Sequence, residues 1–238
     1  MKILIVLPVY NEEKIIAANL KKLGEFAAEN LGAFEYKIIV ADNNSTDLTS
    51  QIVRDLLPTI KNLEYFYLPQ KGKGWAVLTV WQNKADNFDF FAFMDADLAT
   101  DLEAFIPLIK ALENGSDLAI GSRYLKESVI QRSLGRRIFS WAYQLFLKIV
   151  WQTKIKDFPA GFKAVTQKVV KEVVPLIQNK TWFFDSELLY LAEKRGYKIK
   201  EIPVKWREPR QGDNKSRVNP VKVSYLYFKE VFKLRFLR

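Results

Sequence analysis

The sequence predicts an α/β fold in which helices cover both faces of a mostly parallel sheet. Three observations lead to this prediction. Short β-branched or aromatic runs alternate with longer amphipathic segments through most of the chain. Polar residues follow the apolar runs, as they do where parallel strands end at one edge of a sheet. The length of 238 residues and the apolar fraction of 49% are enough for one large packed domain.

The order of strands and helices follows from this alternation. We expect strands at 2–7, 36–41, 63–68, 89–94, 117–121 and 198–204. We expect helices at 12–31, 46–57, 74–85, 101–113, 133–152, 166–177 and 185–195. Pro8 should stop the first strand, Asn11 should cap the first helix, and Ser45 or Thr46 should cap the second. The segments 157–163 and 208–220 are expected to be loops, and the second is a candidate lid.

Two carboxylates follow the most apolar of these strands. The run from Phe90 to Met94 ends in Asp95 and Asp97, with one residue between them. In an extended segment, alternate side chains point the same way, so both carboxylates could reach one cation. Hard oxygen ligands suit Mg²⁺ or Mn²⁺ bound together with a diphosphate. The alternative is a pair of solvated loop or capping aspartates before the helix that starts near Asp101.

The composition excludes several classes of chemistry. The chain has no cysteine, which rules out disulfides, a thiol nucleophile and zinc–thiolate sites. It has no histidine, which rules out Ser–His triads and most transition-metal sites. Any reaction must therefore use carboxylates, lysine, arginine, tyrosine, hydroxyl groups and a hard metal ion. No segment resembles a signal peptide or a spanning helix, so we expect an intracellular protein that is not integral to a membrane.

Charge is distributed unevenly along the chain. Residues 1–120 contain 11 Lys and Arg against 17 Asp and Glu, whereas residues 121–238 contain 26 against 10. The first part therefore carries a net charge of −6 and the second a net charge of +16, which together give the total of +10. Such an excess predicts an anionic partner for this part: phosphates, nucleic acid or a lipid surface.

Two helices in the basic part have unusual faces. Within 133–152, polar residues recur every four positions at Arg136, Ser140, Gln144, Lys148 and Gln152, and the rest is mainly apolar. This pattern fits either a core helix with a functional stripe or an interfacial helix in lipid headgroups. The terminal segment 219–238 reads as a basic amphipathic helix rich in aromatic residues. It fits contact with a membrane surface, or ordinary packing on the domain.

Eight short motifs, taken in order, resemble those of family 2 glycosyltransferases, and most closely the polyprenyl-phosphate (dolichyl-phosphate) glucosyl- and mannosyltransferases. The motifs are Pro8-Val-Tyr-Asn-Glu-Glu13, Ala41-Asp-Asn-Asn-Ser-Thr-Asp47, Lys71-Gly-Lys-Gly74, Asp95-Ala-Asp97, Gly121-Ser-Arg123, Arg136-Arg-Ile-Phe-Ser140, Gly161-Phe-Lys163 and Phe184-Asp-Ser-Glu-Leu188. Each motif alone is weak, and their order makes the resemblance specific. It implies a Rossmann-like, nucleotide-sugar-binding fold of the GT-A type.

The resemblance implies a donor site in the first part of the chain. Three residues would cradle the base and ribose of a UDP- or GDP-sugar: Pro8, Tyr10 and Glu12. Asp42 would hydrogen-bond the base edge, and Asp95 would contact the ribose or the metal. Asp97 would hold the Mg²⁺ or Mn²⁺ that bridges the diphosphate. Lys73 would add positive charge there, unless it is a solvated lysine beside a flexible glycine pair.

The resemblance also implies an acceptor site for a lipid phosphate. Arg123, Arg136 and Ser140 match positions that bind this phosphate in the family, and Arg136 and Ser140 share the polar stripe. Lys215 and Arg217 resemble an element that closes over the phosphates, unless they belong to a solvated basic loop. The reaction implied is an inverting, in-line displacement at the anomeric carbon, which makes the enzyme a hexosyltransferase. A phosphate acceptor is already ionised at neutral pH and needs positioning, not deprotonation.

Two other functions fit parts of the sequence. If the acceptor is a glycan or soluble hydroxyl, a base is needed, and Asp185 is the first candidate and Glu187 the second. Both could instead be helix N-terminal charges that interact with the macrodipole. A basic nucleic-acid-binding module would explain the +16 part but would leave Asp42, Asp95 and Asp97 without a role. We therefore expect no nucleic-acid partner.

The expected organisation is a catalytic domain at 1–217, with a nucleotide-sugar half at 1–123 and an acceptor half at 124–217. A basic amphipathic helix follows at 218–238. We expect peripheral contact with the inner, cytoplasmic face of a membrane, and a separate membrane-anchoring partner is compatible with this. We expect no transmembrane helices in this chain, although many members of the family carry them before or after the catalytic domain. Asp157-Phe-Pro-Ala-Gly161 also replaces the Asp-Thr-Gln-Cys-Gly pattern of the glucosyl branch, so the donor sugar is not inherited from the resemblance.

Overall fold

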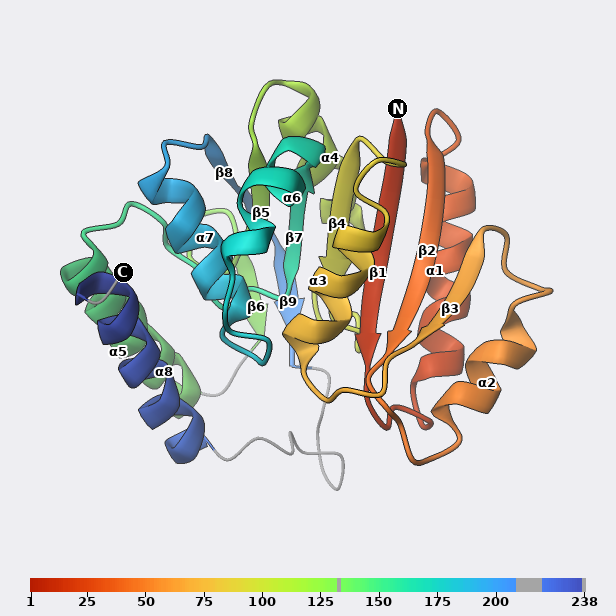
Figure 1. Cartoon of the computed structure of the whole chain (residues 1–238), viewed down its shortest axis with the longest axis horizontal. Coiled ribbons are helices and arrows are strands. Elements are labelled where there is room, and N and C mark those ends of the chain that lie inside the picture. The colour runs from red at the N-terminus through yellow and green to blue at the C-terminus, as the bar shows by residue number, and fades with distance from the viewer. Residues whose placement is uncertain (132–133, 209–219, 237–238) are drawn as a thin grey trace.

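A seven-stranded sheet forms the centre of the molecule (Figure 1). The computed structural model describes residues 1–131, 134–208 and 220–236, with the backbone alone at 134–139, 141 and 220–226. The strands lie in the order β3-β2-β1-β4-β7-β5-β8. Their bounds are β1 Lys2–Val9, β2 Glu35–Asp42, β3 Leu63–Tyr67, β4 Phe90–Met94, β5 Leu118–Ser122, β7 Phe162–Thr166 and β8 Ile199–Pro203. Neighbours are parallel except that β7 is antiparallel to both β4 and β5.

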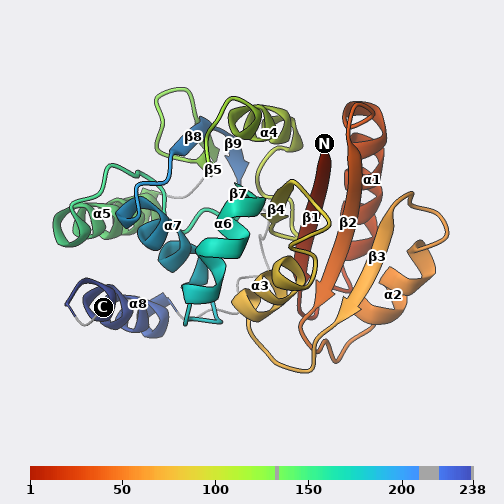
Figure 2. The same ribbon diagram turned by 45° about the horizontal axis from the view of Figure 1, so that its top comes forward.

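Helices cover both faces of this sheet, as predicted (Figure 2). One core contains side chains of α1 Ile16–Asn30, α2 Thr49–Leu56 and α4 Phe105–Glu113. The opposite core contains side chains of α3 Lys73–Asn83, α6 Gln167–Glu172, α7 Phe184–Lys194, α5 Leu134–Trp151 and α8 Pro220–Phe236. Strand β4 contributes Phe91 and Phe93 to this second core and its alternate residues to the first. A strand buried on both faces explains why the sequence of β4 is uniformly apolar.

The first strand continues through Pro8, contrary to our prediction that Pro8 stops it. Strand β1 ends at Val9, and Pro8 lies opposite Ala41 of β2. The pairing of β1 with β4 ends at Val6, so Pro8 lies beyond the part of the strand that has two neighbours. A residue without an N–H group is tolerated there because no bond of the ladder on the β4 side is lost.

The predicted helix caps are wrong for a shared reason. The helices α1 and α2 follow Ile15 and Leu48, and neither has a capping side chain. Asn11 has a φ of 55° and instead joins two loops, because its Oδ1 accepts from the Thr46 N–H at 2.7 Å and its own N–H donates to Ser45 Oγ at 3.0 Å. The polar residues that suggested caps therefore link the loop after β1 to the loop after β2.

Three strands were missed in the sequence. The expected loop 157–163 and helix 166–177 contain β7, then α6, then a 3₁₀ turn at Val174–Leu176 where Pro175 cannot continue an α-helix. Two three-residue strands, β6 Val129–Gln131 and β9 Lys205–Arg207, form a separate parallel pair. Strand β7 lies between β4 and β5, so the two expected halves of the domain share one sheet.

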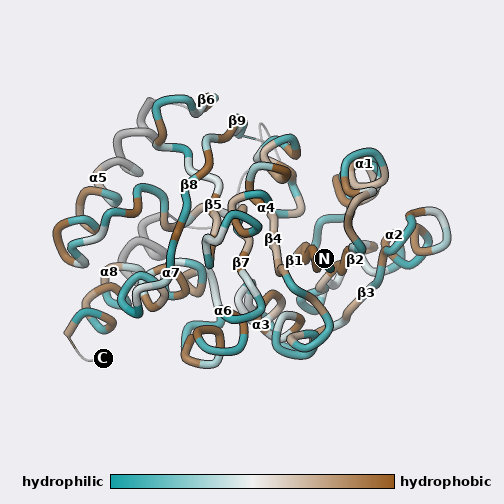
Figure 3. Tube along the Cα trace, turned by 90° about the horizontal axis from the view of Figure 1, so that it is seen from above, coloured by the Kyte–Doolittle hydropathy of each residue, from teal (hydrophilic) through white to brown (hydrophobic). Residues whose placement is uncertain are grey.

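The helices α5 and α8 pack against each other at one end of the molecule (Figure 1). Trp151 Nε1 donates to the carbonyl of Val231 at 3.2 Å, and the rings of Phe146 and Phe228 are 4.6 Å apart. Hydrophobic and hydrophilic stretches alternate along the coloured parts of both helices (Figure 3). Among the helices that the structure describes, none is both long enough and apolar enough to cross a membrane.

Candidate active site

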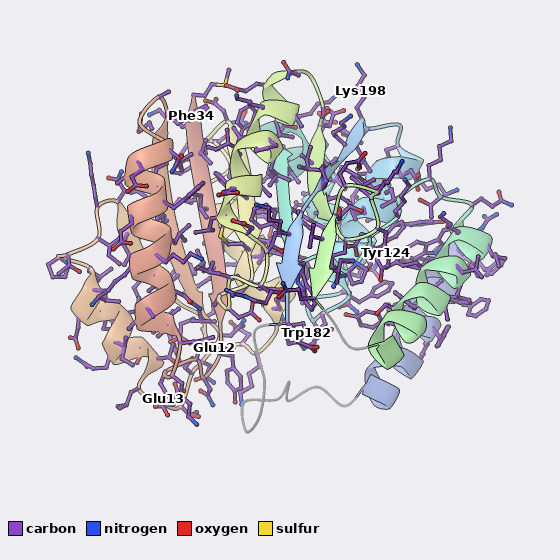
Figure 4. The ribbon with its side chains drawn as sticks, turned by 180° about the vertical axis from the view of Figure 1, so that it is seen from behind. Glu12, Glu13, Phe34, Tyr124, Trp182 and Lys198 are labelled. Atoms are coloured by element: carbon purple, nitrogen blue, oxygen red, sulfur yellow. The ribbon has the colours of Figure 1, made fainter. Side chains whose placement is uncertain are left out.

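A cavity lies where β4 and β5 end, at the edge expected for a ligand in an α/β sheet. It is lined by residues from the ends of β4 and β5, the loop before β7, and β9: Met94, Asp95, Asp97, Leu98, Ala99, Thr100, Gly121, Arg123, Pro159, Ala160, Gly161, Phe162 and Trp206. Figure 4 shows Glu12, Glu13 and Trp182 toward this edge of the molecule, whereas Phe34 and Lys198 lie at the opposite edge. The cavity is therefore lined both by an acidic pair that follows β4 and by an arginine that follows β5.

Asp95 and Asp97 both line the cavity, but not by the alternation that we expected. The chain turns directly after β4, because the Leu98 N–H donates to the Asp95 carbonyl at 3.0 Å and Leu98 has a φ of 47°. Asp97 Oδ1 accepts from the Ala99 N–H at 3.1 Å. Within the described part of the chain, no group of three or more acidic, histidine or cysteine side chains could hold a metal. A metal ion here would have two protein carboxylates and would take its other ligands from substrate or water.

Lys73 is the immediate partner of Asp95. Its Nζ lies 2.5 Å from Asp95 Oδ1, and its side chain is only 9% exposed, so it is not a solvated lysine. Burial alone would lower the pKa of Lys73, but Asp95 and Asp185 raise it above its ordinary value. The glycine at position 72 has a φ of 147°, and a Cβ there would overlap the carbonyl of Lys180. The glycines beside Lys73 thus allow close docking rather than flexibility.

Arg123 faces the cavity from β5 while it is held by Asp157. Its Nε and Nη2 donate to the two oxygens of Asp157 at 2.8 Å each, and its backbone N–H donates to Oδ2 at 2.8 Å. Asp157 is fully buried. Burial by itself would lower the pKa of Arg123, but the Asp157 carboxylate outweighs this effect and raises the pKa above its ordinary value. The ring of Trp206 lies 5.6 Å from the guanidinium carbon. Arg123 is therefore fixed and charged, but two of its nitrogens already serve Asp157.

Asp185 is the second residue of α7, and its charge also acts on Lys73. It is 3% exposed, and its Oδ2 lies 3.7 Å from the Nζ of Lys163. Burial raises the pKa of Asp185, and Lys163 and Lys73 partly oppose this shift. Glu187, the second candidate base, uses its two oxygens to accept from the backbone N–H groups of Gln178 and Asn179. This arrangement gives Glu187 a structural role in the loop before α7.

Three side chains near the cavity had no role in our predictions. Lys163 and Asp157 occur in the quoted segments, but nothing in the sequence indicates that either is buried. Trp182 is 49% exposed, and its ring centre lies 5.4 Å from Lys73 Nζ. An aromatic residue two positions before the α7 segment was the only available signal for it.

The residues predicted to hold the nucleotide lie at the ends of β1 and β2 and in the loop after β1. Asp42 is fully buried, with Oδ1 accepting from the Ser45 N–H at 2.9 Å and Oδ2 from the Tyr65 hydroxyl at 2.6 Å. Burial and Asp42 raise the pKa of Tyr65 to about 12. Tyr10 lies at the surface, and its hydroxyl accepts from Lys71 at 3.0 Å. Pro8 is in β1, and the Glu12 N–H donates to Thr49 Oγ1 at 2.8 Å.

The predicted acceptor residues are placed only in part. Ser140 is partly exposed on α5, and the backbone of Arg136 lies one turn before it, but the side chain of Arg136 is outside the described part. Lys215 and Arg217 lie outside the described residues altogether. The polar stripe does not share one environment, because Gln144 is 6% exposed while Lys148 is exposed.

Comparison with known proteins assigns the family. The family model of glycosyl transferase family 2 matches residues 4–174, well over half of the chain. The chain belongs to glycosyl transferase family 2. This family assignment confirms the resemblance and the predicted class of enzyme, a glycosyltransferase.

Several family 2 relatives match most of the chain. Glycosyltransferase AglD of Haloferax volcanii is 29% identical over 217 residues, which are 90% of this chain and 34% of that protein. The dolichyl-phosphate beta-glucosyltransferase of Dictyostelium discoideum is 29% identical over 98% of this chain and 73% of its own length. The enzyme of that name from Saccharomyces cerevisiae is 30% identical over 86% and 66%, respectively. The chain thus spans between about a third and three quarters of these relatives.

Solved structures confirm the GT-A type of fold. Glucosyl-3-phosphoglycerate synthase from Mycobacterium tuberculosis, in complex with Mn²⁺, UDP and glucosyl-3-phosphoglycerate, superposes with a TM-score of 0.69 at 18% identity, covering 97% of this chain and 77% of that one. The mannosyltransferase PcManGT from Pyrobaculum calidifontis, in complex with GDP-Man and Mn²⁺, gives 0.59 at 16% identity, with coverage of 97% and 69%. At these identities the likeness concerns the fold.

Proposed function

We propose that this family 2 glycosyltransferase moves a hexose from a UDP- or GDP-sugar to a polyprenyl phosphate at a membrane surface. The observation that carries the proposal is that Asp95, Asp97 and Arg123 line one and the same cavity. Carboxylates suit a metal-bound diphosphate, and a guanidinium suits a phosphate acceptor. The dolichyl-phosphate relatives support the choice of acceptor.

A divalent cation fits the acidic pair. Asp95 and Asp97 offer hard oxygen ligands in one cavity, and the chain has no histidine or cysteine to favour a softer metal. A bound Mg²⁺ or Mn²⁺ would neutralise the charge that develops on the departing nucleoside diphosphate. Two solved structures of the same fold contain Mn²⁺, which supports this assignment.

The side chains of the protein provide binding and orientation in this scheme. The base and ribose are held by Pro8 near the end of β1, Tyr10 and Glu12 in the loop after it, and Asp42 at the end of β2. Lys73 stabilises the leaving diphosphate from the N-terminus of α3, where the helix dipole also favours negative charge. An acceptor phosphate then attacks the anomeric carbon in line with the leaving group, which inverts its configuration.

The acceptor phosphate is the proposed ligand of the basic groups. Arg123, Arg136 and Ser140 orient it on the side of β5 and α5, and Lys215 and Arg217 close over the phosphates. The reaction needs no general base, because the phosphate is ionised at neutral pH. This agrees with a cavity whose lining includes no histidine.

A transfer assay with chosen acceptors tests the proposal. Purified protein is incubated with radiolabelled UDP- and GDP-hexoses, Mn²⁺, and either a polyprenyl phosphate or the matching polyprenol. We expect lipid-linked product with the polyprenyl phosphate and none with the polyprenol. Asp97→Ala should form at least a hundredfold less product, since the variant loses one of the two proposed metal ligands of the protein. Product with the polyprenol, or undiminished transfer by Asp97→Ala, would contradict the proposed site.

Transfer to a hydroxyl acceptor is the second candidate, and the burial of Asp185 favours it. Burial raises the pKa of Asp185, which makes its carboxylate a stronger base than a solvated aspartate. In that case a glycan or soluble hydroxyl is glycosylated, and Asp185→Asn abolishes this transfer. The same assay with hydroxyl acceptors in place of the polyprenyl phosphate separates the two functions.

Membrane contact is proposed for the α5–α8 pair. Exposed apolar residues on the two helices include Leu145, Ile149, Phe228, Phe232 and Phe236. Lys229 and Lys233 lie beside the aromatic residues of α8. Apolar residues flanked by lysines suit the boundary between headgroups and acyl chains of an anionic membrane. We place this contact at the cytoplasmic inner face, with a separate anchoring partner where contact alone is too weak.

A further inference from the structure

A fully buried lysine occupies the middle of the central sheet. Lys163 is 0% exposed in β7, between Phe93 of β4 and Ile120 of β5. A charge in such a place is costly unless it is paired and hydrogen-bonded. Burial lowers the pKa of Lys163, and Asp185 and Asp157 oppose this effect. An apolar residue at this position would avoid the cost of burying a charge, so stability alone does not explain why a lysine is present here.

The ammonium group of Lys163 holds the loop that precedes its own strand. It donates to the carbonyl of Phe158 at 2.8 Å and to the carbonyl of Ala160. Its third neighbour is Asp185, whose Oδ2 lies 3.7 Å away at the start of α7. One buried cation thus joins the loop 157–161 to the first turn of α7.

This loop in turn holds two groups of the cavity. Asp157 at its start receives three hydrogen bonds from Arg123. Gly161 at its end accepts from the Asp95 N–H at 3.0 Å, and its Cα lies against the Asp95 carboxylate so closely that a Cβ would overlap it. The positions of Arg123 and Asp95 therefore both depend on the course of five residues.

The charges around this loop alternate in sign. Lys73 pairs with Asp95 at 2.5 Å, Lys163 approaches Asp185 at 3.7 Å, and Arg123 pairs with Asp157 at 2.8 Å. Lys163 is the member of this set that contacts loop backbone, and through it the other two pairs are linked. Removing Lys163 would leave the carbonyl groups of Phe158 and Ala160 without their donor, and would take a nearby positive charge from Asp185.

We propose that Lys163 is a positioning residue, whose ammonium group sets the loop 157–161 and thereby the positions of Arg123 and Asp95 in the cavity. Its effect on transfer rests on the proposed function, but its effect on the loop does not. A displacement of about 1 Å at such a site costs about a hundredfold in rate. Lys163 itself lies beneath the cavity and does not line it.

Hydrogen exchange at single-residue resolution tests the positioning directly. The variant is Lys163→Met, which keeps the length of the side chain and removes its donors. We expect the N–H groups of Asp95 and Arg123, which donate to the loop, to exchange at least tenfold faster than in the wild type. Lys171→Met is the matched control, because Lys171 lies on α6 and forms an exposed ion pair with Asp86. Unchanged exchange at both amides in folded Lys163→Met would overturn the proposal.

A double variant separates positioning from simple charge balance. Lys163→Met with Asp185→Asn removes both buried charges, so the melting temperature should recover most of the loss seen in Lys163→Met alone. The exchange rates at Asp95 and Arg123 should stay high, because the carbonyl groups of Phe158 and Ala160 still lack a donor. If the double variant restores these rates as well, Lys163 is only a charge partner of Asp185 and the proposal is wrong.

Ligand binding gives a second readout. Titration of UDP and of GDP in the presence of Mn²⁺ should give at least tenfold weaker binding for Lys163→Met than for Lys171→Met, since Asp95 has moved. Equal affinities would contradict the proposal, whereas no binding of either nucleotide by the wild type would contradict the proposed function and leave the exchange test decisive. If Lys163→Met does not fold, Lys163→Gln replaces it, because its amide can donate to one of the two carbonyl groups and should give an intermediate exchange rate.

Discussion

In the proposed function, Lys73 and a metal ion would compete for the carboxylate of Asp95. Lys73 Nζ lies 2.5 Å from Asp95 Oδ1, where a divalent cation would also have to bind. Replacement of Lys73 by methionine removes a positive charge next to the acidic pair, so Mn²⁺ alone should bind about tenfold more tightly, which corresponds to ~1.4 kcal/mol. Binding of a nucleoside diphosphate with Mn²⁺ should weaken, because the variant lacks the positive charge that we propose stabilises the diphosphate.

Titration of Mn²⁺ by electron paramagnetic resonance, with and without UDP or GDP, measures both effects. Lys71→Met is a suitable control, since Lys71 lies in the same loop but contacts the Tyr10 hydroxyl instead of a carboxylate. Weaker binding of Mn²⁺ alone to Lys73→Met would mean that Lys73 organises the acidic pair instead of competing for it.

Residues at strand ends were predictable, whereas their partners were not. Asp95, Asp97 and Arg123 follow apolar runs, so the sequence placed them at one edge of the sheet and the structure brings them to one cavity. The partners of these residues come from distant segments: Asp157 is 34 residues from Arg123. The burial of Lys163 depends on three strands and on α7, and lysine gives no local sign of such an environment.

At the scale of elements, the loop before β7 can approach Asp95 closely only because Gly161 has no side chain. A Cβ at this position would overlap the Asp95 carboxylate. Gly161→Ala should therefore displace Asp95 and reduce the affinity for Mn²⁺ with nucleotide at least tenfold, while the melting temperature falls only slightly. Calorimetric titration and thermal unfolding measure the two quantities.

Gly32→Ala is the matched control for this prediction. No heavy atom lies within 4 Å of the position that its Cβ would occupy, so neither quantity should change. If Gly161→Ala binds Mn²⁺ and nucleotide as the wild type does, Asp95 has room to move without loss, and the tight approach has no functional role.

Strand β7 shows why element prediction failed where it did. Its sequence, Phe162 to Thr166, is short, contains a lysine, and follows Pro159 and Gly161, all of which favour a loop. The strand forms because β4 and β5 leave a gap that an antiparallel strand fills. By contrast, the helix expected at 133–152 was found at Leu134–Trp151, because a long amphipathic pattern needs no knowledge of its neighbours.

At the scale of the whole molecule, lysines and exposed aromatic residues lie side by side on α8, at one end of the molecule. The basic part of the chain includes α5 and α8, which pack together at the end opposite α2 (Figure 1). Phe232 on α8 is 49% exposed and lies beside Lys229 and Lys233. Lysines beside exposed aromatic residues predict that the protein prefers anionic membranes and binds them with the α5–α8 end facing the lipid.

Vesicle sedimentation tests this orientation. The protein should sediment with vesicles that contain anionic lipid more than with neutral ones, and added salt should release it because the lysines are screened. Replacement of Phe232 by serine should lower the bound fraction severalfold, since the ring no longer enters the acyl boundary. Leu48→Ser is the control, because Leu48 is 63% exposed next to α2, at the opposite end of the molecule. Equal losses for the two variants would mean that the α5–α8 pair does not face the membrane.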